Sequence, residues 1–160
     1  MVEQHERYMR LALREAEKAV GWDEVPVGAV VVLNGKVIGR GHNLTRRKSD
    51  PTAHAEIVAM RMAAKNIGND RIVGAELYCT LEPCAMCAGA MVHARIAGLI
   101  YGTEDPKAGA CGSVLRVIPN RKLNHRPYVV KDVLATEARE ILQSFFRERR
   151  RLKKQQRSFT

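Results

Sequence analysis

The chain has 160 residues, a length at which one domain can bury a hydrophobic core without disulfide bonds. Its 27 lysines and arginines exceed its 17 acidic residues, and the net charge of +10 favours a polyanionic partner, above all nucleic acid, although a solubilising surface has the same composition. We expect a cytoplasmic protein without membrane association, because the N-terminus lacks a signal-peptide core and no apolar run approaches the roughly 20 residues of a membrane helix.

The first half of the chain predicts a helix, a hairpin and a second helix. Apolar residues recur at helical spacing over residues 5–20, and Gly21 can end that helix. A β-branched run starts at Val27, and the turn signal Asn34-Gly35 predicts a hairpin that extends to about residue 41. Residues 43–51 are expected to form a loop with a basic triplet at 46–48. A helix is then expected over residues 53–65, with His54 in its first turn.

The second half continues the alternation of strands and helices. We expect strands at 76–80, 99–102 and 128–134, a helix that Pro83 opens at its first position, and a loop with a short helical piece over 103–124. A last helix begins at about residue 135 and becomes strongly basic after Phe146. The order predicts an α/β structure around one sheet, antiparallel at the hairpin and with parallel pairing across both strand–helix–strand units. Nothing divides the chain, so we expect a single domain over residues 1–160.

One histidine and two cysteines are candidate metal ligands. His54, Cys84 and Cys87 supply three donors, and three donors with one open position are typical of a catalytic zinc site. His54 lies at the start of one predicted helix, and Cys84 and Cys87 lie at the start of another. The positive end of a helix favours a thiolate over a thiol. Glu56 lies two residues from His54, off its helix face, and is expected to move protons of a zinc-activated water without binding the metal.

Other interpretations of the cysteines remain open. A lone Cys-x-x-Cys motif also suits a redox pair or a structural zinc site, and a structural site would need a fourth ligand. The candidates for that ligand have no characteristic spacing; they are His42, His93, Cys79 and Cys111. The combination of His-x-Glu with Pro-Cys-x-x-Cys is nevertheless the signature of zinc-dependent nucleobase deaminases. Cys79 and Cys111 have no evident disulfide partner, which fits a reducing compartment.

Longer stretches resemble one family. Residues 50–56 and 80–91, together with Asn43 and residues 105–109 and 144–147, are similar to the bacterial tRNA-specific adenosine deaminases, and the similarity covers nearly the whole chain. The resemblance implies a cytidine deaminase-like three-layer α/β/α fold around a central mixed five-stranded sheet. It also implies a homodimer that converts adenosine to inosine at the wobble position, the first of the anticodon, in arginine tRNA.

The same resemblance implies roles for individual residues. One zinc per subunit would be held by His54, Cys84 and Cys87, with Glu56 as the proton shuttle. The implied contacts with the tRNA anticodon loop are Asn43, Ala55, Asp105, Phe145 and Arg147.

Local sequence allows other roles for several of these positions. Asn43 and Asp105 both occur in ordinary turn contexts. Phe145 and Phe146 point to different sides of a helix, so one should join the core while the other can stack on a base or a partner. The basic segment after Phe146 is either a solvated helix end or a phosphate contact.

Two rival functions also fit the metal motif. A deaminase of a free base or nucleoside, such as cytosine, cytidine or guanine, would use the same chemistry but needs no cationic surface. A zinc-stabilised RNA-binding module without catalysis would bind nucleic acid but has no use for Glu56.

Overall fold

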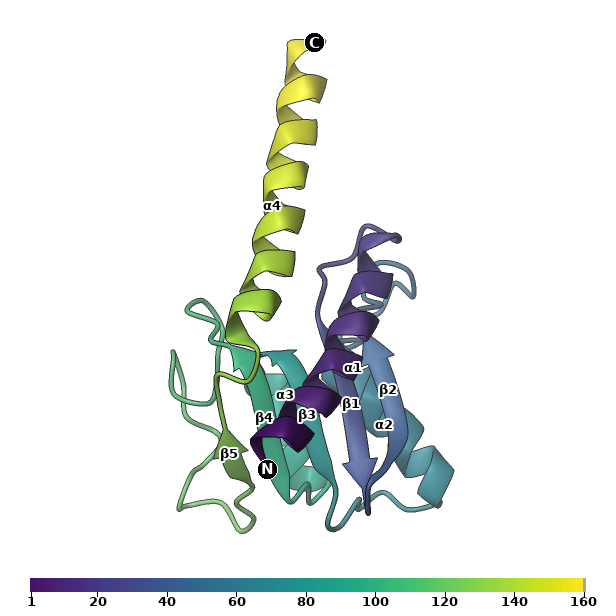
Figure 1. Ribbon diagram of the computed structural model, residues 1–160, viewed down its shortest axis with the longest axis vertical. Coiled ribbons are helices and arrows are strands. Elements are labelled where there is room, and N and C mark those ends of the chain that lie inside the picture. The colour runs from purple at the N-terminus through teal and green to yellow at the C-terminus, as the bar shows by residue number, and fades with distance from the viewer. Residues whose placement is uncertain (160) are drawn as a thin grey trace.

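The structure is a computed structural model that describes residues 1–159, and these residues form one five-stranded sheet with helices on both faces (Figure 1). The helices are α1 (Val2–Val20), α2 (Ala55–Ile67), α3 (Ala85–His93) and α4 (Ala135–Ser158). The strands are β1 (Gly28–Leu33), β2 (Lys36–His42), β3 (Glu76–Leu81), β4 (Gly98–Thr103) and β5 (Tyr128–Val130). The expected three-layer α/β/α fold with a mixed five-stranded sheet is confirmed.

The strand order is β2-β1-β3-β4-β5. β1 is antiparallel to both β2 and β3, whereas β3, β4 and β5 are parallel. Asn34 and Gly35 both have positive φ, 51° and 76°, as the tight hairpin turn between β1 and β2 requires. The predicted parallel pairing across the first strand–helix–strand unit is wrong. β2 and β3 run in the same direction, but β1 lies between them and pairs with both.

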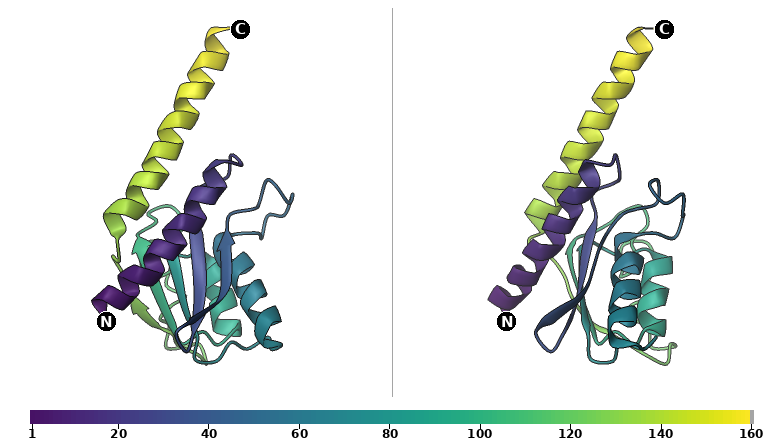
Figure 2. Two further views of the ribbon diagram at one scale, coloured as in Figure 1. Left: turned by 45° about the vertical axis from the view of Figure 1, so that its right-hand side comes forward. Right: turned by 90° about the vertical axis from the view of Figure 1, so that its right-hand side faces the viewer.

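Each face of the sheet carries two helices. In the right-hand view of Figure 2, α1 and α4 lie on one side of the sheet, and α2 and α3 lie on the other. Successive strand residues point to opposite faces, so β1 sends Val30 toward α1 and Val31 toward the larger core under α2 and α3. The α1 side of the core consists of Tyr8, Met9, Ala12, Val30, Val32, Tyr78 and Ile100.

Glycine allows α2 to lie unusually close to β2. A Cβ atom at Gly41 would be 2.5 Å from the carbonyl oxygen of Ala55, and one at Gly39 would collide with the backbone of Ala59. Backbone therefore packs directly against backbone at this contact. The contact sets the position of α2 on the sheet.

Two predicted elements in the last third of the chain are wrong. No helical piece forms between β4 and β5, where the chain makes turns and one isolated bridge between Cys111 and Arg116. β5 ends at Val130, four residues earlier than expected, because Asp132 and Leu134 adopt left-handed backbone conformations that redirect the chain into α4. The last turns of α4 extend beyond the other elements (Figure 1). None of the helices in residues 1–159 is long and apolar enough to cross a membrane.

Candidate active site

The three candidate ligands meet where α2 and α3 begin. His54 is the N-cap of α2 and Cys84 is the N-cap of α3, both with extended backbone, and Cys87 lies in the first turn of α3. The predicted proximity to two helix N-termini is confirmed, but His54 and Cys84 precede their helices and do not lie in the first turns. Pro83 is likewise outside α3, because its carbonyl accepts a hydrogen bond from the backbone N–H of Ala110 instead of starting the helix.

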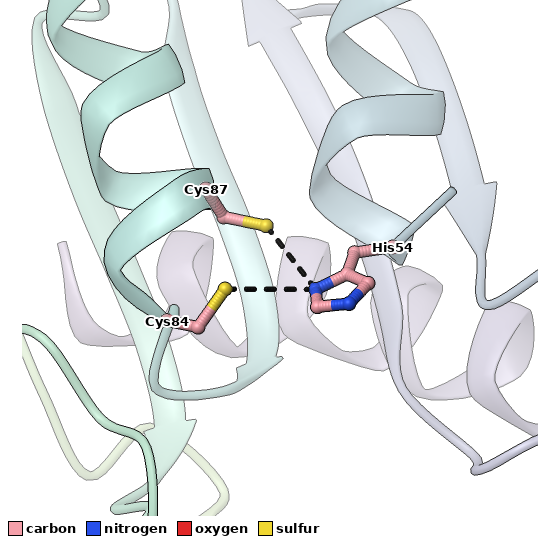
Figure 3. A group of neighbouring side chains, drawn as sticks. All are labelled: His54, Cys84 and Cys87. Carbon is pink, nitrogen blue, oxygen red and sulfur yellow. Dashed lines mark hydrogen bonds between the residues drawn. The ribbon is translucent and has the colours of Figure 1, made fainter. Parts of the chain in front are cut away.

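The donor atoms have the spacing of a tetrahedral metal site. Both thiols point toward the imidazole of His54 (Figure 3), with Nδ1 lying 3.6 Å from Sγ of Cys84 and 3.5 Å from Sγ of Cys87. A tetrahedral zinc with bonds of about 2.3 Å to sulfur and about 2.05 Å to nitrogen puts these atoms about 3.6 Å apart. The three residues therefore fit a metal ion of this kind without rearrangement.

The two thiols share a hydrogen bond that shifts their pKa values in opposite directions. The hydrogen bond with Cys87, and then the one with His54, lowers the pKa of Cys84 to about 3, whereas the hydrogen bond with Cys84 and burial raise the pKa of Cys87. The hydrogen bond with Cys84 also raises the pKa of His54, although burial opposes it. The positive ends of α2 and α3 add to the preference for negative charge here. The site thus provides a thiolate, the form of cysteine that binds metal.

Glu56 lies beside this cluster but outside it. It is the second residue of α2, its side chain is buried, and the metal-ligand group in residues 1–159 consists of His54, Cys84 and Cys87 alone. Burial raises the pKa of Glu56, while hydrogen bonds from its own backbone N–H and from Cys87 oppose the rise. A buried carboxyl group with a raised pKa exchanges protons more readily near neutrality than an exposed one.

None of the alternative fourth ligands joins the cluster in the described part of the chain. Cys79 and Cys111 are free and buried, and burial raises the pKa of both thiols. His42 and His93 also lie outside the group. Three protein donors leave one position open, as a catalytic site requires.

Asn43 ties two segments together next to His54. Its Nδ2 donates to the carbonyl oxygen of Val25 at 3.0 Å, and its Oδ1 accepts the backbone N–H of Ala55 at 3.0 Å. Asn43 therefore supplies a hydrogen bond to the start of α2, while one amide hydrogen and one lone pair remain for another partner. Ala55 is fully buried, and its N–H is occupied by this contact.

Asp105 forms the turn that its sequence context predicts. Its carboxylate accepts the backbone N–H groups of Lys107 and Ala108, at 3.0 and 3.3 Å. The backbone N–H of Asp105 donates to Glu82 at 3.1 Å. The side chain of Asp105 is partly exposed and lies in the loop that follows β4.

Two buried glutamates that the sequence analysis did not single out hold loops near the site. Glu24 accepts the backbone N–H of Arg46 at 2.9 Å, and that of Arg47 at 3.4 Å, in the basic loop after β2. Glu82 holds the loop after β4 in the same way. Sequence carried no clear signal of their burial: Glu24 precedes Val25 but follows the charged Asp23, and Glu82 precedes Pro83 in a segment that reads as an ordinary helix start.

The aromatic pair on α4 divides as predicted. Phe145 is 7% exposed and packs below the guanidinium of Arg149, whereas Phe146 is 41% exposed. Phe145, which the resemblance assigns to the substrate, is thus the buried member. Arg147 is exposed, and its guanidinium donates to the hydroxyl of Ser144.

A His-Cys-Cys cluster beside a buried glutamate, on this layered fold, is the arrangement of a nucleobase deaminase. The family model described as MafB19-like deaminase matches residues 3–150. The chain is 51% identical to the tRNA-specific adenosine deaminase of Agrobacterium fabrum over 143 residues. The aligned region covers 89% of this chain and 94% of that protein. The chain belongs to the family of tRNA-specific adenosine deaminases.

Solved structures agree with this assignment. One, from a study of A-to-I editing by tRNA:A34 deaminases at the wobble position of transfer RNA, matches with a TM-score of 0.82 and 50% identity, over 85% of this chain and 99% of that chain. A guanine deaminase from Bacillus subtilis is less similar, with a TM-score of 0.60 and 38% identity over 62% of this chain and 64% of that one.

Proposed function

We propose that this protein is a zinc-dependent hydrolase that converts adenosine to inosine at the wobble position of the anticodon of arginine tRNA. The observation that carries the zinc assignment is the 3.5 and 3.6 Å spacing of the thiols from Nδ1 of His54. A zinc ion there would supply Lewis acidity that lowers the pKa of a water molecule, which could then lose a proton near neutral pH and attack carbon 6 of adenine as a nucleophile.

Glu56 would move the protons. Its carboxylate takes a proton from the attacking water and delivers it to the ring nitrogen next to carbon 6. It then helps to protonate the amino group, which leaves as ammonia, so that adenosine and water become inosine and ammonia. The burial of Glu56 supports this role, because it raises the pKa of the carboxyl and lets it hold a proton between the two steps.

Residues from several parts of the chain are proposed to bind an anticodon loop. The remaining hydrogen-bonding capacity of Asn43 supports a contact with the flipped nucleoside, next to the backbone of Ala55. Asp105, Phe145 and Arg147 are proposed as further tRNA contacts. A net charge of +10 supports a phosphate-rich substrate, and an anticodon loop already exposes its bases, which reduces the cost of flipping one out.

We further propose a cytoplasmic homodimer. A tRNA substrate supports the cytoplasm as the location. Two methionines of α3 differ in exposure: Met91 is fully buried in the core, whereas Met86 is 37% exposed and is free to contact a second subunit. Sedimentation at micromolar concentration should show a dimer, and a fully active monomer would overturn this part of the proposal.

One assay separates the proposed substrate from the rivals. The zinc-loaded protein is incubated with an arginine tRNA anticodon stem-loop, and in parallel with free adenosine, cytidine and guanine, while inosine and ammonia are measured. We expect turnover on the stem-loop alone. Deamination of a free base at a comparable rate would favour the small-molecule reaction, to which the similarity with guanine deaminase points, and no ammonia from any substrate would favour an RNA-binding module.

A further inference from the structure

The loop after β4 lies against the segment that carries a metal ligand. β3 and β4 are parallel neighbours with Leu81 opposite Thr103, so Glu82 and Asp105 leave the sheet side by side. Glu82 comes two residues before Cys84. The loop crosses this segment, and the backbone N–H of Ala110 donates to the carbonyl oxygen of Pro83 at 2.8 Å.

The carboxylate of Glu82 is the centre around which the loop closes. The side chain is 1% exposed, and it accepts the backbone N–H groups of Asp105 at 3.1 Å, Cys111 at 2.9 Å and Ser113 at 3.3 Å. The hydroxyl of Ser113 donates to it as well. No cation pairs with Glu82 within residues 1–159, so its charge is compensated by hydrogen bonds from the loop. Hydrogen bonds to a buried charge are among the stronger ones in proteins.

The loop is shaped around this carboxylate. A Cβ atom at Gly109 would collide with all three terminal atoms of the Glu82 side chain. Only glycine, which has no side chain, allows the loop backbone to come this close to the carboxylate. Both ends of the loop are hydrogen-bonded to the same carboxylate group.

We propose that Glu82 is a positioning residue for tRNA, which acts by fixing the loop of residues 105–113 relative to the ligand-bearing segment at Cys84. This inference rests on the proposed function, because it assigns the loop to substrate binding through Asp105. A buried carboxylate with only a structural role would affect stability alone. A positioning role requires that loosening the loop weakens tRNA binding while the metal site and the chemical step persist.

The test is Glu82→Gln, which keeps the shape but turns one acceptor oxygen into an N–H₂ group that faces N–H donors. The matched control is Glu104→Gln. It changes an exposed carboxylate that directly precedes this loop and whose partner is the surface ammonium of Lys131. Zinc content, hydrogen–deuterium exchange of residues 105–113, the Kd for a stem-loop, KM and kcat are measured for both. In case Glu82→Gln does not fold, Ser113→Ala removes one donor alone and should give the same pattern at smaller size.

We expect Glu82→Gln to retain zinc and to exchange the amide hydrogens of its loop faster. Kd and KM should rise about tenfold, because contacts that are out of place weaken tRNA binding, while kcat should stay within about threefold of the unmodified protein. The control should match the unmodified protein. Unchanged Kd and KM would overturn the proposal, as would a loss of zinc together with kcat, which would mean that Glu82 serves the ligand segment. The Kd and exchange measurements need no turnover, so they test this inference even if the unmodified protein fails to deaminate the stem-loop.

Discussion

Replacing Asn43 with alanine tests whether this residue is structural as well as substrate-binding. The substitution removes two side-chain hydrogen bonds of 3.0 Å each, to the carbonyl of Val25 and from the buried backbone N–H of Ala55 at the start of α2. A typical hydrogen bond contributes about 1 kcal/mol, and an N–H at a helix start that loses its side-chain acceptor costs about 0.5–2 kcal/mol. We therefore expect Asn43→Ala to lower the free energy of unfolding by about 1.5–3 kcal/mol.

Thermal unfolding of the zinc-loaded protein, monitored by circular dichroism, measures this loss. For a chain of this size each kcal/mol corresponds to about 2–4 °C, so Tm should fall by about 3–12 °C. Asn66→Ala is the matched control, because it deletes one exposed hydrogen bond to the carbonyl of Ile38 from the other end of α2. Its effect should stay within about 0.5 kcal/mol. The reasoning is refuted if Asn43→Ala unfolds within about 1 °C of the control while stem-loop binding is lost, since Asn43 would then serve the substrate alone.

Three further changes test the site and the basic helix. Cys87→Ala should remove zinc and activity together, as measured by elemental analysis and by turnover. The control Cys79→Ala changes a buried cysteine outside the cluster and should retain the metal. Full zinc occupancy in Cys87→Ala would contradict the ligand assignment. Glu56→Gln should keep zinc and fold but lose turnover by about 10² to 10⁴, and near-normal deamination would exclude its role as proton shuttle. Removing the chain after Phe146 should weaken tRNA binding and reduce the slope of log K against log salt by about 0.7–0.9 per lost phosphate contact, and parallel slopes would mean that this segment is only solvated.

Helices and strands were predictable where one local pattern determines them. The period of apolar residues identifies α1 and α2, and Asn34-Gly35 specifies its turn through backbone preference alone. The order of strands was not predictable in this way. The insertion of β1 between β2 and β3 depends on pairing between residues that are far apart in the chain, for example Ala29 with Cys79. Local periodicity carries no information about such pairing.

The candidate site shows the same division. His54, Cys84 and Cys87 were identifiable because they belong to two short motifs. His54 lies at the start of α2, and Cys84 and Cys87 lie together at the start of α3. The partners of Glu82 were not, because its carboxylate binds backbone N–H groups 23 to 31 residues away, and any sequence can supply such donors. Sequence also could not decide which of two adjacent phenylalanines faces the core, because the orientation of α4 relative to the sheet follows from long-range packing.

The close contact between β2 and α2 makes the metal geometry sensitive to substitutions far from the metal. A side chain at Gly41 would have to move the carbonyl of Ala55 from 2.5 Å to an ordinary contact distance, a shift of roughly 1 Å. His54 caps the same helix end, so its imidazole would travel with Ala55, whereas metal–ligand distances tolerate errors of only about 0.2 Å. In a library randomised at position 41 and selected for activity, glycine would consequently be as strictly required as a metal ligand. Protein engineering for new specificity has more freedom in the loops than in this part of β2, although β2 carries no catalytic side chain.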